Sequence, residues 1–293
     1  MHIPMPKVPE ETKGIFKFLK PSDIAIIGSY MFDAAISPNI TVDIMIEMPA
    51  KMFQKQDYQN YRYMKKKAIY LAFIAFNITD DIAKSKTFMN DNLRPFLKII
   101  PNGKLGTKMN VFIHISAQEG SFKLSRLLPE KNNVRSEWFF NEEKSNMSFC
   151  FFFLIYILYI YIYIYIYNFY NICNITVTED LLPTPHYNSI ILHDLTMKIH
   201  AENMKIIKEY PNLRDGIILL KIWLIQRGLS KGCTAFNGYV ITMFILYLLS
   251  IKKLNTFMSS YQIIRNVWNY LGMIFYTYIY TYIHTYVRTH KKE

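Results

Sequence analysis

The stretch PSDIAIIGSY, residues 21–30, places a short apolar run directly before a glycine and a serine. A second apolar run, TVDIMIEM, follows at residues 41–48 and ends at Pro49. Short runs rich in isoleucine and valine that end at glycine or proline are typical of buried strands. The two runs therefore predict a strand at 24–27, a Gly28-Ser29 turn, a helix at 30–35 and a strand at 41–48.

The next hundred residues continue the alternation of helix and strand. A helix is expected from Asp57 to Ile78, because apolar side chains recur there at helical spacing. Strands are expected at 96–100 and 109–116, with a turn at 101–103 between them. The first part of the chain is thus predicted to be a mixed α/β domain.

The chain becomes helical after Pro183. One helix is expected from Asn188 to Lys208, and the next carries leucine and isoleucine on one face and stops at Gly228. The apolar run 239–249 is too short to cross a bilayer and suits a buried helix, and a last helix is expected at 259–271. The second part is predicted to be all-helical.

Composition favours acidic partners in a reducing compartment. The 293 residues carry a net charge of +12 and the sequence pI is near 9.3. Such a charge favours binding to polyanions, and RNA is the first candidate among them. The three cysteines Cys150, Cys173 and Cys233 form no CxxC pair, so neither a disulfide framework nor a zinc site is indicated. The first eleven residues do not have the pattern of a secretory signal.

Two segments do not look like ordinary protein sequence. Residues 149–170 contain no charged residue, and Tyr159 to Tyr167 alternate tyrosine and isoleucine without a break. An ATATAT repeat gives this pattern when translated, and the tail 276–290 also fits alternating purine and pyrimidine codons. Our hypothesis is that both are translated non-coding DNA, the first of them a retained intron. The alternative is a membrane anchor at 149–170.

A Gly-Ser turn after a first strand, followed by a strand with acidic residues, resembles the nucleotidyltransferase fold of the polymerase-beta superfamily. In that family the turn holds nucleotide phosphates, while an Asp-x-Asp pair and a third carboxylate on a neighbouring strand bind two metal ions. Here Asp43 is followed at the next same-face position by Met45, and residues 109–114 contain no carboxylate. We therefore expect Gly28, Ser29 and Asp43 to be vestigial, with no metal and no cofactor.

The second domain has a more specific resemblance. The block LLKIWLIQRGL at 219–229, followed by FNGYVI at 236–241, is similar to the helical substrate-binding domain of poly(A) polymerases and oligoadenylate synthetases. We expect Trp223 to be a core anchor rather than a base-stacking residue.

These blocks, together with RLLPEKNNVR at 126–135, resemble the Nrap family of nucleolar RNA-associated proteins. Family members are much longer, so the chain is expected to be a fragmentary gene product. The expected organisation is a nucleotidyltransferase-like domain, a low-complexity insertion, a helical PAP/OAS1-like domain and a low-complexity tail, at 1–146, 147–178, 179–272 and 273–293.

The resemblance implies a non-catalytic scaffold of the small-subunit processome that acts in ribosomal RNA processing in the nucleolus. The implied partners are pre-ribosomal RNA and processome proteins, with neither a membrane nor a small-molecule substrate. On charge, the RNA-binding candidates are Lys65, Lys66, Lys67, Lys131 and Arg135.

One alternative remains open for the site. An active RNA nucleotidyltransferase would need Asp43 and an acid from elsewhere, such as Glu47.

Overall fold

The computed structural model describes residues 3–5, 16–36, 40–89, 92–106, 108–134, 183–230 and 236–273. The contacts divide these residues into two compact units. The first contains the described residues up to Val134 together with those from Pro183 to Asn203, and the second contains those from Met204 onward. The helix α3 (Pro185–Glu209) contributes residues to both units.

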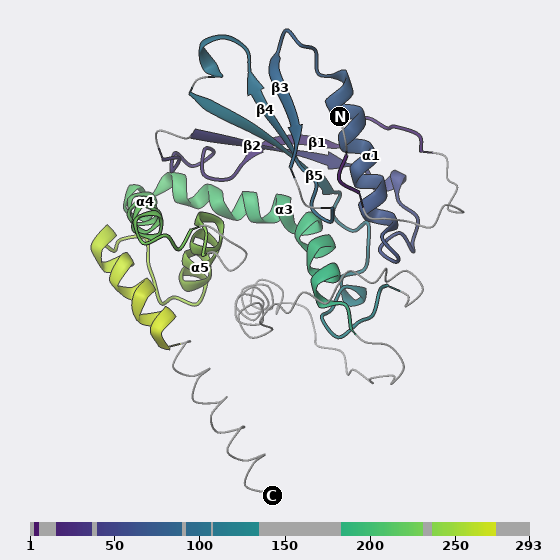
Figure 1. Ribbon diagram of the computed structural model, residues 1–293. Helices are drawn as coiled ribbons and strands as arrows, with labels where there is room; N and C mark the ends of the chain where they lie inside the picture. Colours follow the sequence, from purple (N-terminus) through teal and green to yellow (C-terminus); the bar gives the residue numbers. More distant parts are fainter. Residues whose placement is uncertain are drawn as a thin grey trace, which may run out of the picture. The chain divides into compact units, whose positions relative to one another are not determined.

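A five-stranded sheet forms the centre of the first unit (Figure 1). Its strands are β1 (Asp23–Ile27), β2 (Ile40–Met48), β3 (Ala83–Phe88), β4 (Leu97–Pro101) and β5 (Met109–Ala117). The strand order is β1-β2-β5-β4-β3, in which β2 and β5 are parallel and the other pairs are antiparallel.

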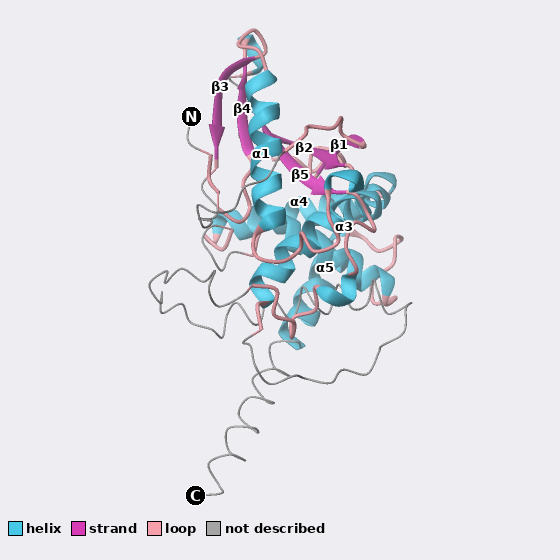
Figure 2. Cartoon of the chain, turned by 90° about the vertical axis from the view of Figure 1, so that its right-hand side faces the viewer, coloured by secondary structure: helices cyan, strands magenta, loops and turns pink. Residues whose placement is uncertain are grey.

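One face of the sheet packs on the helix α1 (Arg62–Asn77), which runs along it in Figure 2. The core joins Tyr70 and Leu71 of α1 to Ile46 of β2 and Ile113 of β5. Because side chains alternate along a strand, the odd-numbered residues of β2, including Asp43, point to the opposite face.

That opposite face lies toward α3. Asp23 shares the face of Asp43 through the register of β1 and β2, and its carboxylate pairs with Lys198 of α3 at 2.6 Å. The tertiary fold thus separates an apolar face under α1 from a polar face that includes Asp43.

The second unit contains α4 (Pro211–Gln226), α5 (Gly238–Ser250) and a helix over residues 260–273. The predicted apolar stripe of α4 is buried, as the exposures of Leu213, Ile217, Leu220 and Leu224 confirm. Asn237 caps α5 by accepting a hydrogen bond from the backbone N–H of Val240 at 3.0 Å. The mixed sheet followed by a helical unit confirms the predicted fold class.

Three elements differ from the sequence prediction. The prediction of a helix at 30–35 is wrong, because this segment forms turns. Asp33 has a left-handed backbone with φ 58°, and Ala34 N donates a hydrogen bond to Ser29 O. The helix expected from Asp57 begins only at Arg62, because the two preceding residues are also left-handed. The strand β3 was not predicted, since its sequence AKSKTF lacks apolar alternation.

The two ends of the gap between Val134 and Pro183 in the described residues lie next to each other. Thr184 N donates to Lys131 O at 3.1 Å, and Thr184 Oγ1 accepts from Asn133 N at 3.0 Å. The predicted insertion at 147–178 lies outside the described residues, and so does the predicted tail at 273–293 except for Met273. Within the described ranges, no helix is long and apolar enough to cross a membrane.

Because these hydrogen bonds join residues on both sides of the predicted insertion, removal of residues 147–178 is expected to leave the fold intact. Shortening the chain between two points that are already joined changes the free energy of unfolding by only about 1 kcal/mol. Urea unfolding of the deletion variant, followed by circular dichroism, measures this. Loss of a cooperative transition would contradict the insertion hypothesis.

Candidate nucleotidyl-transfer site

The Gly28-Ser29 turn lies directly beside Asp43. Gly28 adopts a left-handed backbone with φ 71°, and a Cβ added there would lie 2.8 Å from Asp43 Oδ2. Both the conformation and the close approach require glycine. The structure therefore brings together the two features that the resemblance to nucleotidyltransferases predicted.

The side chain of Asp43 also contacts a histidine. His114 Nε2 lies 3.0 Å from Asp43 Oδ1, and both side chains are about a quarter exposed, at 27% and 23%. His114 belongs to β5, the parallel neighbour of β2, and its ring packs on Phe96 with 5.2 Å between centroids. The neighbouring strand thus presents an imidazole to Asp43 where the resemblance calls for a carboxylate.

The next same-face position of β2 is apolar. Met45 is fully buried, at 0% exposure. Glu47 follows two residues later, is 4% exposed, and accepts a hydrogen bond from Ser22 Oγ at 2.5 Å. Four residues of strand separate its Cα from that of Asp43 by about 13 Å, whereas paired catalytic metals lie about 4 Å apart.

Asp43 and Glu47 are therefore too far apart to bind one metal pair. Across the part of the chain that the structure describes, no group of three histidine, cysteine, aspartate or glutamate side chains could hold a metal ion.

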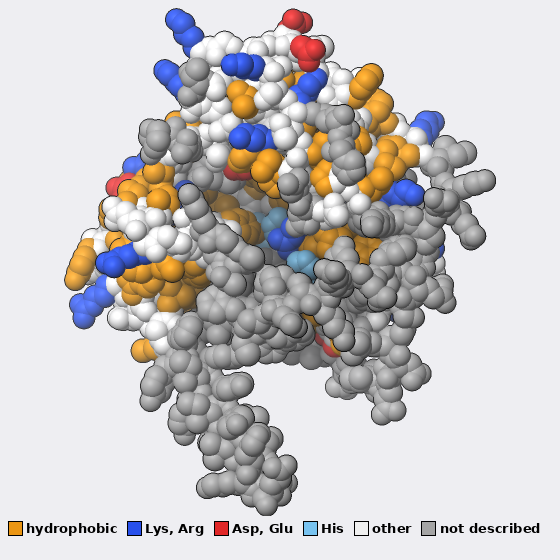
Figure 3. All heavy atoms as spheres, in the orientation of Figure 1, with side chains coloured by type: hydrophobic (Ala, Val, Ile, Leu, Met, Phe, Trp, Pro, Cys, Tyr) orange, Lys and Arg blue, Asp and Glu red, His pale blue; other side chains and the backbone are white. Residues whose placement is uncertain are grey.

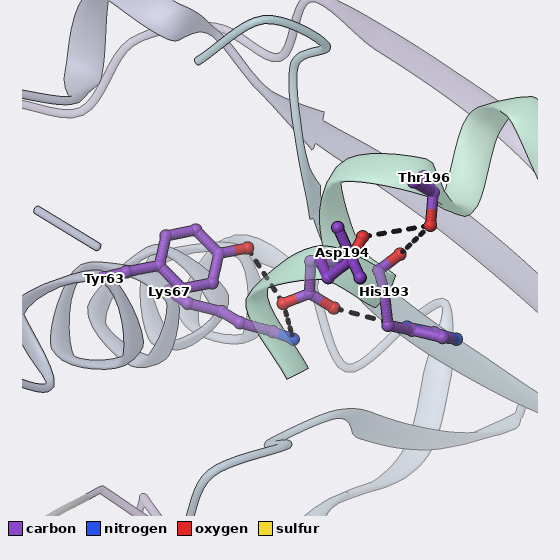
Figure 4. A network of polar contacts seen from close by, with 6 residues as sticks. Tyr63, Lys67, His193, Asp194 and Thr196 are labelled. Carbon is purple, nitrogen blue, oxygen red and sulfur yellow. Dashed lines mark hydrogen bonds and ion pairs between the residues drawn. The ribbon is translucent and has the colours of Figure 1, made fainter. Parts of the chain in front are cut away.

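A buried polar cluster joins α1 to α3 within the first unit (Figure 4). Lys67 Nζ lies 2.6 Å from Asp194 Oδ2, and the Tyr63 hydroxyl donates to the same oxygen at 2.8 Å. His193 Nδ1 lies 3.6 Å from Asp194 Oδ1. Burial acts to raise the pKa of Asp194, but the charge of Lys67 and the contact with His193 hold it below its usual value.

The cluster corrects one of the predicted RNA contacts. Lys67 is only 4% exposed and its ammonium is paired with Asp194, so it offers no charge to RNA. Lys66 pairs with Asp57 at 2.6 Å and also donates to Met52 O. Lys65, Lys66 and Lys131 are half-buried, and Arg135 lies outside the described residues. For these four the RNA contact stays a prediction.

The distinctive block at 126–134 has a structural role that its sequence did not reveal. The side chain of Asn188 at the start of α3 donates to Leu128 O at 2.9 Å and to Lys131 O at 2.8 Å. It also accepts from Asn133 Nδ2 at 2.7 Å, while Asn60 N donates to Asn133 O at 2.9 Å. The block therefore fastens α3 to the residues that precede α1.

Two aromatic side chains of the helices, Trp223 and His200, have different environments. Trp223 was expected to be a core anchor but is only half-buried. Its ring contacts that of Trp268, with 4.3 Å between the ring centroids. Arg227 lies over its ring at 5.7 Å. His200 is 4% exposed, and burial lowers its pKa to about 3, so this histidine is a neutral core residue.

The mixed sheet, the Gly28-Ser29 turn beside Asp43 and the helical second unit define a protein of the nucleotidyltransferase-like class. Residues 1–156 match the family model described as Nrap protein domain 1, and residues 212–283 match the Nrap protein PAP/OAS-like domain. The chain belongs to the Nrap family.

Curated relatives agree with this assignment. The chain is 39% identical over 274 residues to Nucleolar protein 6 of Xenopus laevis, covering 92% of this chain and 21% of that protein. It is 33% identical over 276 residues to Nucleolar protein 6 of Homo sapiens, covering 92% and 22%. The chain thus spans about a fifth of the length of these relatives, whose shared name supports the predicted nucleolar localisation.

Proposed function

We propose that this chain is a non-catalytic, RNA-associated scaffold that acts in ribosomal RNA processing and small-subunit ribosome biogenesis. The observation that carries the non-catalytic part is the environment of Asp43. One of its oxygens faces His114, the other lies against Gly28, and the same-face position that follows it on the strand is Met45.

Phosphoryl transfer by two metal ions depends on several oxygen ligands within coordination distance. A single carboxylate paired with an imidazole cannot hold two hard cations at the separation that the reaction needs. The fold therefore serves as a structural platform, and neither a cofactor nor a small-molecule substrate is part of the proposal.

The RNA-associated part is supported by charge and by family. The chain carries a net charge of +12, which attracts phosphate backbones, and its relatives are named for the nucleolus. Figure 3 shows Lys and Arg side chains spread over the visible face among few acidic ones. The proposed partners are pre-ribosomal RNA and proteins of the small-subunit processome.

Nucleotide incorporation tests the absence of catalysis. The purified 293-residue chain, given an RNA primer, labelled nucleoside triphosphates and either magnesium or manganese, is expected to incorporate no nucleotide. The Asp43→Ala variant is the matched control, and it is expected to behave identically. Incorporation by the unaltered chain that disappears in Asp43→Ala would overturn the proposal and establish an active transferase.

Crosslinking of the endogenous protein to RNA in cells tests the second part. Pre-ribosomal RNA is expected in the crosslinked material. Recovery of no RNA would contradict the RNA-associated role.

A further inference from the structure

Two loops of the first unit lie together at one edge of the sheet. Because β2 and β5 are parallel and Met48 pairs with Ala117, the segments that follow these strands, 49–61 and 118–134, start side by side. Gln118 Oε1 accepts from Ala50 N at 2.9 Å, and the rings of Phe53 and Phe122 lie 5.3 Å apart. We call residues 49–61 and 118–134 the loop layer.

The loop layer stays together along its length. Asn60 N donates to Asn133 O at 2.9 Å, so the far ends of the two segments also meet. Between these ends, the ring of Tyr58 contacts that of Phe122, with 6.0 Å between centroids. The two segments therefore present one continuous surface of the first unit.

The exposed charges of this surface are nearly all positive. The exposed cations on the loop layer and on the first residue of α1 are Lys51, Lys55, Lys123, Arg126 and Arg62. Their side chains form no ion pair with any other residue that the structure describes. Of the acids, Asp57 is buried against Lys66, Glu130 is half-buried and only Glu119 is exposed.

The loop layer lacks the apolar centre that a protein partner requires. Both of its segments are fully described, and no large hydrophobic side chain in either of them is exposed. Phe122 and Leu127, for example, are 4% and 2% exposed. Stable protein interfaces bury aromatic or aliphatic anchors at their centre, whereas phosphate binding needs only accessible cations.

We propose that the loop layer binds the phosphate backbone of RNA through Lys51, Lys55, Lys123 and Arg126. The proposal rests on the RNA-associated function and assigns it a surface. Because the surface offers cations without exposed aromatic rings, it recognises the backbone rather than the bases.

Salt-dependent RNA binding tests the assignment. The complete 293-residue chain is compared with a variant in which Lys51, Lys55, Lys123 and Arg126 are all replaced by glutamate. A matched control replaces four exposed cations of the second unit, namely Lys205, Lys252, Lys253 and Arg265, by glutamate and so changes the net charge equally. The probes are poly(U) and an RNA hairpin duplex, and circular dichroism verifies that both variants are folded.

The loop-layer variant is expected to bind poly(U) about tenfold or more weakly than the unaltered chain at low salt. The slope of log affinity against log salt should become shallower by about 0.7 for each phosphate that the variant no longer neutralises. The control variant should keep most of the affinity and most of the salt dependence of the unaltered chain. An equal loss in the two variants would overturn the assignment, because affinity would then follow net charge alone.

Unchanged binding by the loop-layer variant would also overturn it. In that case crosslinking to pre-ribosomal RNA could still succeed, which separates failure of this surface from failure of the proposed function.

Discussion

Replacing Asp194 with alanine is expected to lower the free energy of unfolding of the first unit by about 3–5 kcal/mol. The carboxylate is the partner of Lys67, which is 4% exposed, and of the Tyr63 hydroxyl, which is 0% exposed. Removing it leaves a buried ammonium without a counter-charge and a buried hydroxyl without an acceptor. Both desolvation penalties then fall on the folded state.

A surface ion pair in the same unit provides the control. Asp23 and Lys198 also lie 2.6 Å apart, but their side chains are 37% and 41% exposed. Water screens this pair, so Asp23→Ala should cost at most about 1 kcal/mol. Urea unfolding monitored by circular dichroism measures both variants.

A double variant separates charge burial from packing. Lys67→Met combined with Asp194→Leu replaces the pair with apolar side chains and should recover the part of the stability that is lost through the unpaired ammonium of Lys67, while the Tyr63 hydroxyl still lacks its acceptor. If Asp194→Ala unfolds at the same urea concentration as Asp23→Ala, the buried pair does not stabilise the junction of α1 and α3.

The second large effect is expected at Asn188. This residue is 0% exposed and makes three side-chain hydrogen bonds to the block at 126–134. The carbonyl groups of Leu128 and Lys131 each keep one backbone donor when it is replaced. Asn188→Leu, which roughly preserves volume, should therefore cost about 1 kcal/mol for each missing hydrogen bond, or about 3 kcal/mol in total.

Hydrogen exchange locates this effect. The amide of Thr184, which donates to Lys131 O, should exchange faster in Asn188→Leu than in the unaltered protein. Asn237→Ala removes the cap of α5 in the second unit and should cost about 1 kcal/mol without changing exchange at Thr184. Equal exchange at Thr184 in both variants would contradict the fastening role of Asn188.

The departures from the Asp-x-Asp pattern were visible in the sequence because strand geometry is local. Alternation alone places Met45 on the face of Asp43, and residues 109–114 contain no acid. The strand β2 and the helix α4, which had the clearest apolar patterns, formed as expected. What the sequence could not supply was His114 as the partner of Asp43, since that contact depends on the register between two strands.

Lys67 marks the limit of reasoning from charge. A run of basic residues at 65–67 looks like a single exposed cluster, yet helical geometry puts Lys67 on the same face as Tyr63 and Tyr70. That spacing was a usable signal. Its meaning, however, depended on Asp194, which lies 127 residues further along the chain.

The sequence by itself determined four of the five strands, the absence of an Asp-x-Asp pair and the family, because each of these depends on neighbouring residues or on short blocks. The tertiary structure alone decided the pairing of β3 with β4, the burial of Lys67 and the convergence of the loops after β2 and β5. These features come from contacts between segments that are distant in the sequence. Their free energy depends on which side chains are buried against one another in the fold, and the secondary-structure propensity of neighbouring residues does not determine it.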